Sequence, residues 1–205
     1  MRIIFNNAGK RFNYEWILKN INYTFETPGA YAIVGPNGSG KSTLIQMIAG
    51  VLSPSSGSIS YHNGSSVVSA DGIFKYISIA APYLELVEEF TLEEQILFQL
   101  KFKSFSNNLS PVDVADISEL KSNRSKEIRN FSSGMKQRLK VTLAVLADVP
   151  IILLDEPTTN LDQKGVEWYH ELMKKFTENR LVIVCSNTER EISYCTSRVD
   201  VLLYK

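Results

Sequence analysis

Apolar residues fall along the N-terminal part of the chain in two kinds of pattern. Residues 2–5, 16–25 and 30–34 are short runs rich in aliphatic, β-branched and aromatic side chains, and each is predicted to be a strand. Residues 44–52 instead repeat apolar side chains at helical spacing. The glycine-rich stretch 35–43 lies between the last strand and this helix, so the order is strand, loop, helix.

The middle of the chain changes from strand to helix patterns. Strands are predicted at 58–61 and 75–80, followed by the capping-box sequence Thr91-Leu92-Glu93-Glu94 at the start of a helix. Another helix is predicted from Ser110-Pro111 through Leu120. No strand pattern occurs between about 91 and 130, which predicts a helical insertion in an α/β core.

Alternation of helix and strand returns after the insertion. A helix is predicted to open at Ser132, a buried strand to cover 151–154, and a helix to cover 166–178. Strands at 181–185 and 199–204 are expected to close the sheet. We expect a single domain of residues 1–205, with a core formed by 1–84 and 141–205 and a helical subdomain at about 85–140.

Composition narrows the class of protein. The 205 residues are 44% hydrophobic and 21% charged, with a formal net charge of zero, which is typical of a globular domain. The neutral balance gives no electrostatic footprint for nucleic acid. No apolar run approaches the roughly 18 residues of a membrane span, and the N-terminus lacks the apolar segment of a signal peptide. A cytoplasmic protein is expected, with Cys185 and Cys195 as reduced core thiols.

The loop at 35–43 has the composition of a phosphate-binding loop. Glycines allow successive backbone N–H groups to point inward, and the next helix adds the partial positive charge of its N-terminus. Lys41 can reach the β and γ phosphates of a nucleotide, and the Ser42 hydroxyl can ligate Mg²⁺. The predicted nucleotide-binding residues of the loop are Asn37, Gly38, Ser39, Gly40, Lys41, Ser42 and Thr43.

Three aromatic residues precede the loop. One of Phe12, Tyr14 and Trp16 can stack on a base, and Phe12 is the predicted contact. The alternative is that all three pack on a face of the sheet. The sequence leaves both explanations open.

An acidic pair follows the predicted strand at 151–154. Asp155, at the carboxyl end of the strand, can hold Mg²⁺ directly or through water, so Ser42 and Asp155 are the predicted metal ligands. Glu156 can orient or deprotonate an attacking water, which makes it the predicted catalytic base. The alternative is a pair of acids that only ends a strand.

Together these motifs resemble those of the nucleotide-binding subunit of ABC transporters. Residues 35–43 match the Walker A motif of that family, residues 151–156 match Walker B, and Thr159-Asn160-Leu161-Asp162 matches the D-loop. Phe131-Ser132-Ser133-Gly134-Met135 resembles the family's signature motif. The resemblance runs from about residue 3 to 204, and it implies an α/β fold: a P-loop NTPase core with an antiparallel β subdomain and a helical insertion that carries the signature.

The resemblance implies a mechanism. ATP and Mg²⁺ would be the cofactors, and two cassettes, identical or not, would dimerise around ATP and separate after hydrolysis. Each would hold the γ phosphate of the other's ATP through Ser132, Ser133, Gly134 and Met135, with Asn160 and Asp162 of the D-loop nearby. The motion would power a separate membrane-spanning transporter subunit, with this chain on the cytoplasmic face and no nucleic acid involved.

Two positions depart from the family. Ala80-Ala81-Pro82-Tyr83 stands where the family usually has a glutamine. The contact that this glutamine makes to Mg²⁺ and water would have to be supplied by Glu85 or by a water. Asn187 stands where the family has a switch histidine. Asn187, the second predicted catalytic residue, can donate a hydrogen bond to the γ phosphate but cannot become cationic. Turnover is therefore expected to be slow, and Asn187→His is expected to raise it.

Alternatives remain at the level of the whole protein. If the chain is not a transporter subunit, it is expected to be a soluble ABC ATPase of an assembly unrelated to transport, or an ATP-gated module with little turnover.

Charge is segregated in the helical insertion, with acidic residues mainly at 85–119 and basic residues mainly at 121–140. Solvated helix faces explain this, or the acidic run at 83–94 docks a basic, partly apolar helix of the membrane subunit.

Overall fold

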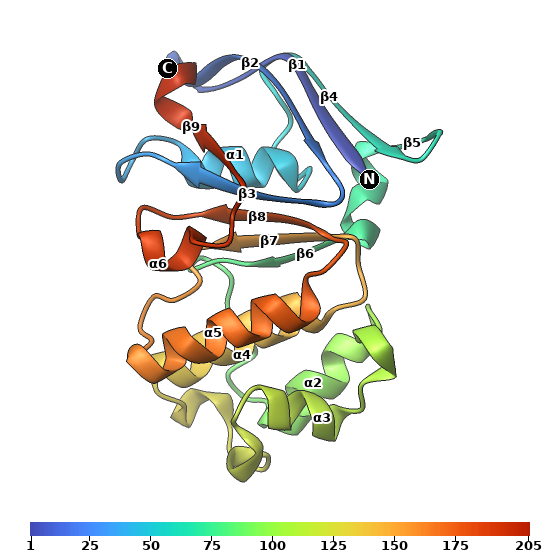
Figure 1. The fold of residues 1–205 in the computed structure, drawn as a ribbon, viewed down its shortest axis with the longest axis vertical. Coiled ribbons are helices and arrows are strands. Elements are labelled where there is room, and N and C mark those ends of the chain that lie inside the picture. The colour runs from blue at the N-terminus through green and yellow to red at the C-terminus, as the bar shows by residue number, and fades with distance from the viewer. The chain divides into compact units, whose positions relative to one another are not determined.

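The computed structural model describes all 205 residues and divides into two compact units. Unit 1 consists of Met1–Ile77, Pro150–Asp155 and Asn179–Lys205, and unit 2 of Ser78–Val149 and Glu156–Glu178. Unit 1 contains most of the strands, and unit 2 contains most of the helical residues (Figure 1). The division of the chain into a single domain with a helical subdomain stays a prediction.

An antiparallel sheet forms the first part of unit 1. Its strand order is β2-β1-β4-β5, and the strands are β1 (Arg2–Phe12), β2 (Glu15–Glu26), β4 (Ser56–Asn63) and β5 (Ser66–Val68). Ile3 of β1 pairs with Phe25 of β2, and both side chains are buried. The strands predicted at 2–5, 16–25 and 58–61 are confirmed, although each is longer in the structure.

A parallel sheet forms the second part of unit 1. Its strands run in the order β7 (Ile151–Asp155), β8 (Leu181–Cys185), β3 (Gly29–Val34) and β9 (Ser197–Asp200). Every residue of β7 and β8 is buried, as expected for strands covered on both faces. Because parallel strands end at the same edge, the loop after β3 meets the residues at the ends of β7 and β8.

The C-terminal strand was predicted too long. β9 ends at Asp200, and Val201–Tyr204 forms a 3₁₀ turn, η5, in which Asp200 Oδ1 accepts a hydrogen bond from Leu202 N at 2.9 Å. Leu202 and Leu203 are 49% and 78% exposed. The apolar run at 199–204 therefore does not continue into the sheet, because only its first part is buried. The helix α1 (Lys41–Ile48) and the short elements η1 (Ala70–Tyr76) and α6 (Glu189–Ile192) complete unit 1. The strand predicted at 75–80 begins only at Ile77, where β6 (Ile77–Ala80) leads into unit 2.

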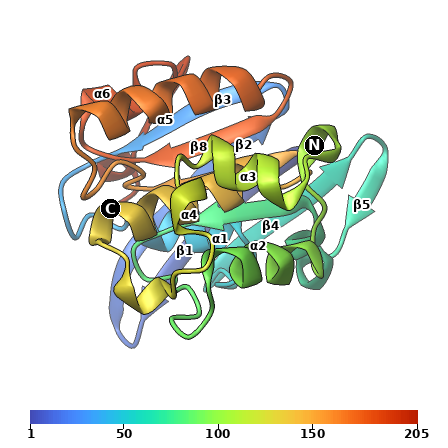
Figure 2. The ribbon, with the colours of Figure 1, turned by 90° about the horizontal axis from the view of Figure 1, so that it is seen from below.

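Unit 2 is built mainly from four helices. These are α2 (Leu92–Leu100), α3 (Pro111–Ile117), α4 (Ser133–Leu146) and α5 (Gln163–Phe176), with 3₁₀ turns η2 (Ser106–Asn108), η3 (Lys121–Asn123) and η4 (Ile128–Asn130). α3 packs against both α2 and α4, and α4 packs against α5 (Figure 2). The predicted capping box is confirmed: Thr91 Oγ1 accepts from Glu94 N at 3.2 Å, and Thr91 N donates to Glu94 Oε2 at 2.8 Å.

The acidic and basic stretches of unit 2 pair with each other. Salt bridges join Glu88 to Lys136, Glu93 to Arg124 and Glu119 to Arg138. The hydrogen bond from Lys136 holds the pKa of Glu88 below its usual value. Much of the charge segregation seen in the sequence is thus neutralised inside this unit.

Cys185 and Cys195 both lie in unit 1. The two cysteines form no disulfide: Cys185 is buried, and burial raises the pKa of Cys195 to about 12. No helix in the structure combines the length and the apolar character needed to cross a bilayer.

Candidate functional site

The phosphate loop connects β3 to α1 (Lys41–Ile48) in unit 1. Gly35, Gly38 and Gly40 have φ values of +147°, +75° and +101°, a region that favours glycine. A Cβ atom at Gly40 would lie 2.9 Å from Ile17 Cγ2, whereas one at Gly38 would meet nothing within 4 Å. The loop is therefore closely packed where it enters the helix and open at its middle, where a ligand can approach the backbone.

Two polar side chains of the loop fit a phosphate ligand. Lys41 is 6% exposed, and its Nζ donates hydrogen bonds to the carbonyls of Gly35 at 2.7 Å and Pro36 at 3.2 Å. Ser39 is 4% exposed, and its Oγ is buried with no hydrogen-bond partner. An unpaired buried polar group costs about 1–3 kcal/mol. A phosphate oxygen would supply the missing partner.

Oxygen donors for a metal lie beside the loop. Ser42 Oγ, on α1, donates a hydrogen bond of 2.8 Å to Asp155 Oδ2, at the end of β7. Asp155 is 3% exposed. A hydroxyl and one carboxylate suit Mg²⁺, which keeps several waters and takes its other ligands from substrate phosphates. The structure contains no group of three or more His, Cys, Asp or Glu side chains that could hold a metal by themselves. The structure therefore brings together both predicted metal ligands.

Asn187 follows β8 and contacts the same loop. Its Oδ1 accepts from Gly35 N at 3.3 Å, and its Nδ2 donates to Asn37 Oδ1 at 3.2 Å. The sequence predicted that Asn187 would lie near a γ phosphate, but it gave no signal for these two contacts. Asn187 and Asn37 are both exposed, so the pair lies at the open side of the loop.

The aromatic residues upstream of the loop lie at the turn between β1 and β2. Phe12 is 46% exposed and Tyr14 is 97% exposed. Lys10 Nζ lies 5.4 Å from the centre of the Phe12 ring, and the Arg11 guanidinium lies 5.7 Å from that of Trp16. The choice of Phe12 as the base contact stays a prediction.

The signature residues begin α4 in unit 2. Ser132 caps this helix, because its Oγ accepts from Met135 N at 3.2 Å. A cavity of about 340 Å³ opens at this point, lined by Ser132, Ser133, Gly134, Met135, Arg138, Asn160, Leu161 and Asp162. A Cβ atom at Gly134 would lie 2.9 Å from Asn160 O, so the glycine allows the D-loop to approach the helix. Signature and D-loop, which are separate in sequence, therefore share one cavity.

Arg138 also lines this cavity, although the sequence did not predict it as a site residue. Its guanidinium stacks over the Trp168 ring, 4.7 Å from the centre, and pairs with Glu119. These two contacts hold a cation beside the N-terminus of α4.

Glu156 occupies a strained turn directly after β7. Its φ is +48°, which is uncommon for a residue with a side chain and marks a position fixed by its surroundings. Gln137 of α4, which is 6% exposed, donates through Nε2 to the carbonyls of Glu156 at 3.3 Å and Pro157 at 2.9 Å. Gln137 was not predicted as a site residue, since its role depends on a contact between α4 and a turn remote in sequence.

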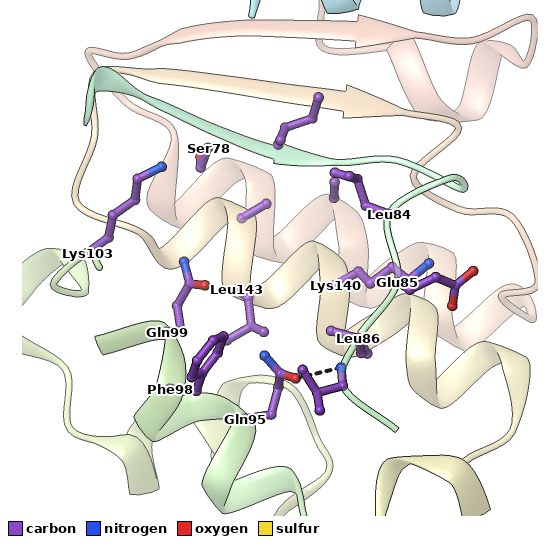
Figure 3. Close-up of a pocket in the computed structure, with 14 residues that line it drawn as sticks. Ser78, Leu84, Glu85, Leu86, Gln95, Phe98, Gln99, Lys103, Lys140 and Leu143 are labelled. Atoms are coloured by element: carbon purple, nitrogen blue, oxygen red, sulfur yellow. Dashed lines mark hydrogen bonds between the residues drawn. The ribbon is translucent and has the colours of Figure 1, made fainter. Parts of the chain in front are cut away.

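A second cavity of about 340 Å³ lies among the helices of unit 2 (Figure 3). Gln95, Phe98 and Gln99 reach into it from α2, and Lys140 and Leu143 line it from α4. The segment after β6 contributes Leu84, Glu85, Leu86 and Val87. This segment is held by Gln95 Oε1, which accepts from Val87 N at 3.1 Å. Part of the acidic run thus lines a cavity whose walls contain both apolar and polar side chains.

Comparison with known families identifies the chain. The model of the family described as "ABC transporter" matches residues 18–159. The chain belongs to the ABC transporter family of ATPases. Both the predicted resemblance and the predicted P-loop NTPase fold are thereby confirmed.

Individual relatives of this ABC ATPase cover nearly its whole length. The uncharacterized ABC transporter ATP-binding protein YybJ of Bacillus subtilis (strain 168) is 29% identical over 197 residues, covering 95% of this chain and 90% of YybJ. The lantibiotic transport ATP-binding protein SrtF of Streptococcus pyogenes is 26% identical over 191 residues, covering 88% and 77%. A bacterial ABC transporter cassette solved as a dimer superposes with a TM-score of 0.82 at 24% identity, covering 97% of this chain and 94% of that chain.

Proposed function

We propose that this ABC ATPase binds and hydrolyses ATP as the motor subunit of a transporter whose membrane-spanning part is a separate chain. The observation that carries the proposal is the hydrogen bond between Ser42 and Asp155 beside a phosphate loop that contains buried Lys41 and the unpartnered Ser39 hydroxyl. These groups fit a nucleoside triphosphate with its bound Mg²⁺. The printed names of YybJ and SrtF, both ATP-binding proteins of transporters, support the assignment to transport.

In this proposal the residues of unit 1 bind and orient the nucleotide. Backbone N–H groups of the loop, Lys41 and Ser39 hold the phosphates, and Phe12 contacts the base. Ser42 and Asp155 hold Mg²⁺, which when bound neutralises charge on the β and γ phosphates. Glu156 accepts a proton from the attacking water.

Dimerisation would complete the site. α4 is 14 residues long, and its N-terminus carries the partial positive charge of a helix dipole at Ser132. Arg138 adds a cation to the cavity at that point. We propose that this cavity binds the γ phosphate of ATP held by a second cassette. Hydrolysis then separates the two cassettes, because ADP has no γ phosphate.

The second cavity of unit 2 is our proposed docking place for a helix of the membrane subunit. Its walls include Leu84, Leu86, Phe98 and Leu143, which suit apolar side chains. Three charged residues also line it, the exposed Glu85 and two lysines, Lys103 and Lys140. The cavity walls therefore suit apolar side chains of a partner helix, and we propose that a basic side chain of that helix meets the exposed carboxylate of Glu85 and avoids the two lysines.

Glu156→Gln tests the motor. Removal of the base is expected to lower phosphate release by at least about a hundredfold, while ATP binding survives and the ATP-bound dimer accumulates. Phosphate release and light scattering with ATP and Mg²⁺ measure the two effects. Lys41→Ala is the control that should lose nucleotide binding, and with it the dimer.

The same variant separates the alternatives. If the wild-type chain dimerises with ATP but releases no more phosphate than Glu156→Gln, the chain is an ATP-gated module and not a motor. Purification of tagged Glu156→Gln protein with ATP from native membranes is expected to recover a membrane-spanning chain. Recovery of only soluble partners would favour an assembly unrelated to transport.

A further inference from the structure

Asn187 makes two complementary hydrogen bonds to the phosphate loop through one amide group. Its oxygen accepts from the backbone of Gly35 at 3.3 Å, and its nitrogen donates to the side chain of Asn37 at 3.2 Å. Gly35 is the first residue after β3, and Asn37 lies two residues further along the loop. The amide therefore spans the first part of the loop and ties it to the end of β8.

The turn that carries Asn187 is itself fixed within unit 1. Ser186, 1% exposed, donates from its Oγ to the carboxylate of Glu191, 4% exposed, and accepts from Thr188 N at 2.8 Å. On the outer side, Glu189 of α6 forms a two-bond pair with Arg198 of β9, at 2.7 and 2.6 Å. The turn that carries Asn187 is thus fixed by a buried hydrogen bond of Ser186 and by an exposed salt bridge of Glu189.

We propose that Asn187 is a positioning residue that holds the phosphate loop in the conformation that receives the phosphates of any nucleotide, ADP as well as ATP. The proposal deepens the proposed function and depends on the loop being a nucleotide site. It gives Asn187 a task that differs from a contact with the γ phosphate.

The amide is well suited to this task. It presents an acceptor and a donor side by side in one plane, and the loop offers a donor at Gly35 N and an acceptor at Asn37 Oδ1. An aspartate in its place would put a second acceptor against Asn37 Oδ1. The two nitrogens of a histidine ring point in divergent directions, so a histidine could satisfy only one of the two loop groups.

ADP distinguishes the two tasks. A γ-phosphate contact affects the binding of ATP only, whereas a residue that positions the loop affects both nucleotides. Loss of both hydrogen bonds is expected to weaken binding of each nucleotide roughly five- to tenfold, which corresponds to about 1–1.4 kcal/mol. The variant Asn187→Ala, measured by titration with fluorescent ADP and with fluorescent ATP in the Glu156→Gln background, should show this loss for both nucleotides.

Asn22→Ala is a matched control. Asn22 forms a similar pair of bonds between β1 and β2, where its Oδ1 accepts from Asn7 N at 2.9 Å and its Nδ2 donates to Asn7 Oδ1 at 3.1 Å, besides a bond from Nδ2 to Asn20 O at 3.2 Å. The control should leave both nucleotide affinities unchanged. It reports any general effect of removing an exposed asparagine that makes two such bonds.

A double-mutant cycle adds a second measurement. Asn37→Ala removes one of the two bonds, so its effect on ADP affinity should be less than additive with that of Asn187→Ala. Asn37→Asp retains the acceptor and should remain coupled to Asn187.

Unchanged ADP affinity in Asn187→Ala, with only ATP weakened, would overturn the proposal and leave the proposed function intact. Full additivity with Asn37→Ala would also overturn it. If the wild-type chain bound neither nucleotide, the proposed function itself would fail, and the proposal with it.

Discussion

Ser39 and Lys41 start from different states in the nucleotide-free loop. Ser39 Oγ has no partner, whereas Lys41 Nζ already donates to two loop carbonyls. A phosphate therefore adds a hydrogen bond at Ser39 but only replaces partners at Lys41. Part of the binding energy thus comes from satisfying a group that the free protein leaves buried and unpaired.

Ser39→Ala should separate stability from binding. Removal of the unpaired hydroxyl is expected to raise the free energy of unfolding of the nucleotide-free protein by about 1 kcal/mol, because a desolvation cost disappears. The same change should weaken nucleotide binding several-fold. Chemical denaturation without nucleotide and ADP titration measure the two quantities.

Ser42→Ala is the contrasting control for Ser39→Ala. Ser42 donates to Asp155 at 2.8 Å, so its removal leaves a buried carboxylate with one bond fewer. This variant should be less stable than the wild type without nucleotide. If Ser39→Ala were destabilised to the same degree, the Ser39 hydroxyl would have a partner in solution and the explanation would be wrong.

At the scale of elements, the sequence predicted most of what depends on local patterns. The strands at 151–154 and 181–185 were apparent from continuous apolar runs, and the capping box at Thr91 and the pair Ser110-Pro111 marked helix starts that the structure contains. Local patterns also gave the motifs, since phosphate loops and signatures are contiguous stretches of sequence.

What the sequence could not predict depends on contacts between distant segments. The bonds from Asn187 to the loop, and from Gln137 to the turn at Glu156, join residues that only the fold brings together. The end of β9 was missed for a similar reason. Apolar Leu202 and Leu203 are exposed, and burial cannot be read from residue type alone.

The N-terminus of α4 allows the signature to be tested as a helix element. Ser132→Ala is expected to lower stability by about 1 kcal/mol, the usual cost of losing an N-cap, and also to reduce ATP-dependent dimerisation and hydrolysis. Ser110→Ala is the matched control, because Ser110 caps α3 in the same way and lies outside the signature cavity. Denaturation and phosphate release are the measurements. Equal effects of both variants on hydrolysis would show that Ser132 acts only as a cap.

At the scale of the whole molecule, the charges cancel, and six salt bridges pair part of them directly. Acidic and basic residues each number 22, and several pairs link the acidic run to the basic stretch of unit 2. Glu88 and Glu93 are therefore partly neutralised within the chain. Glu85 and Glu89 are exposed and form no salt bridge, so they are the more available carboxylates for a partner.

Docking of the membrane subunit should accordingly depend on the unpaired carboxylates. We expect the double variant Glu85→Gln and Glu89→Gln to weaken binding to the membrane subunit about three- to tenfold at low salt, and to flatten its salt dependence, because exposed charges are screened by ions. Glu88→Gln should have a smaller effect. Lys136→Met is its control, since this change breaks the same salt bridge but leaves the Glu88 charge in place. Binding would be measured with the co-purified membrane chain at several salt concentrations. If the double variant bound as the wild type does at every concentration, the acidic run would serve only the internal pairs of unit 2, and the docking surface would have to lie elsewhere.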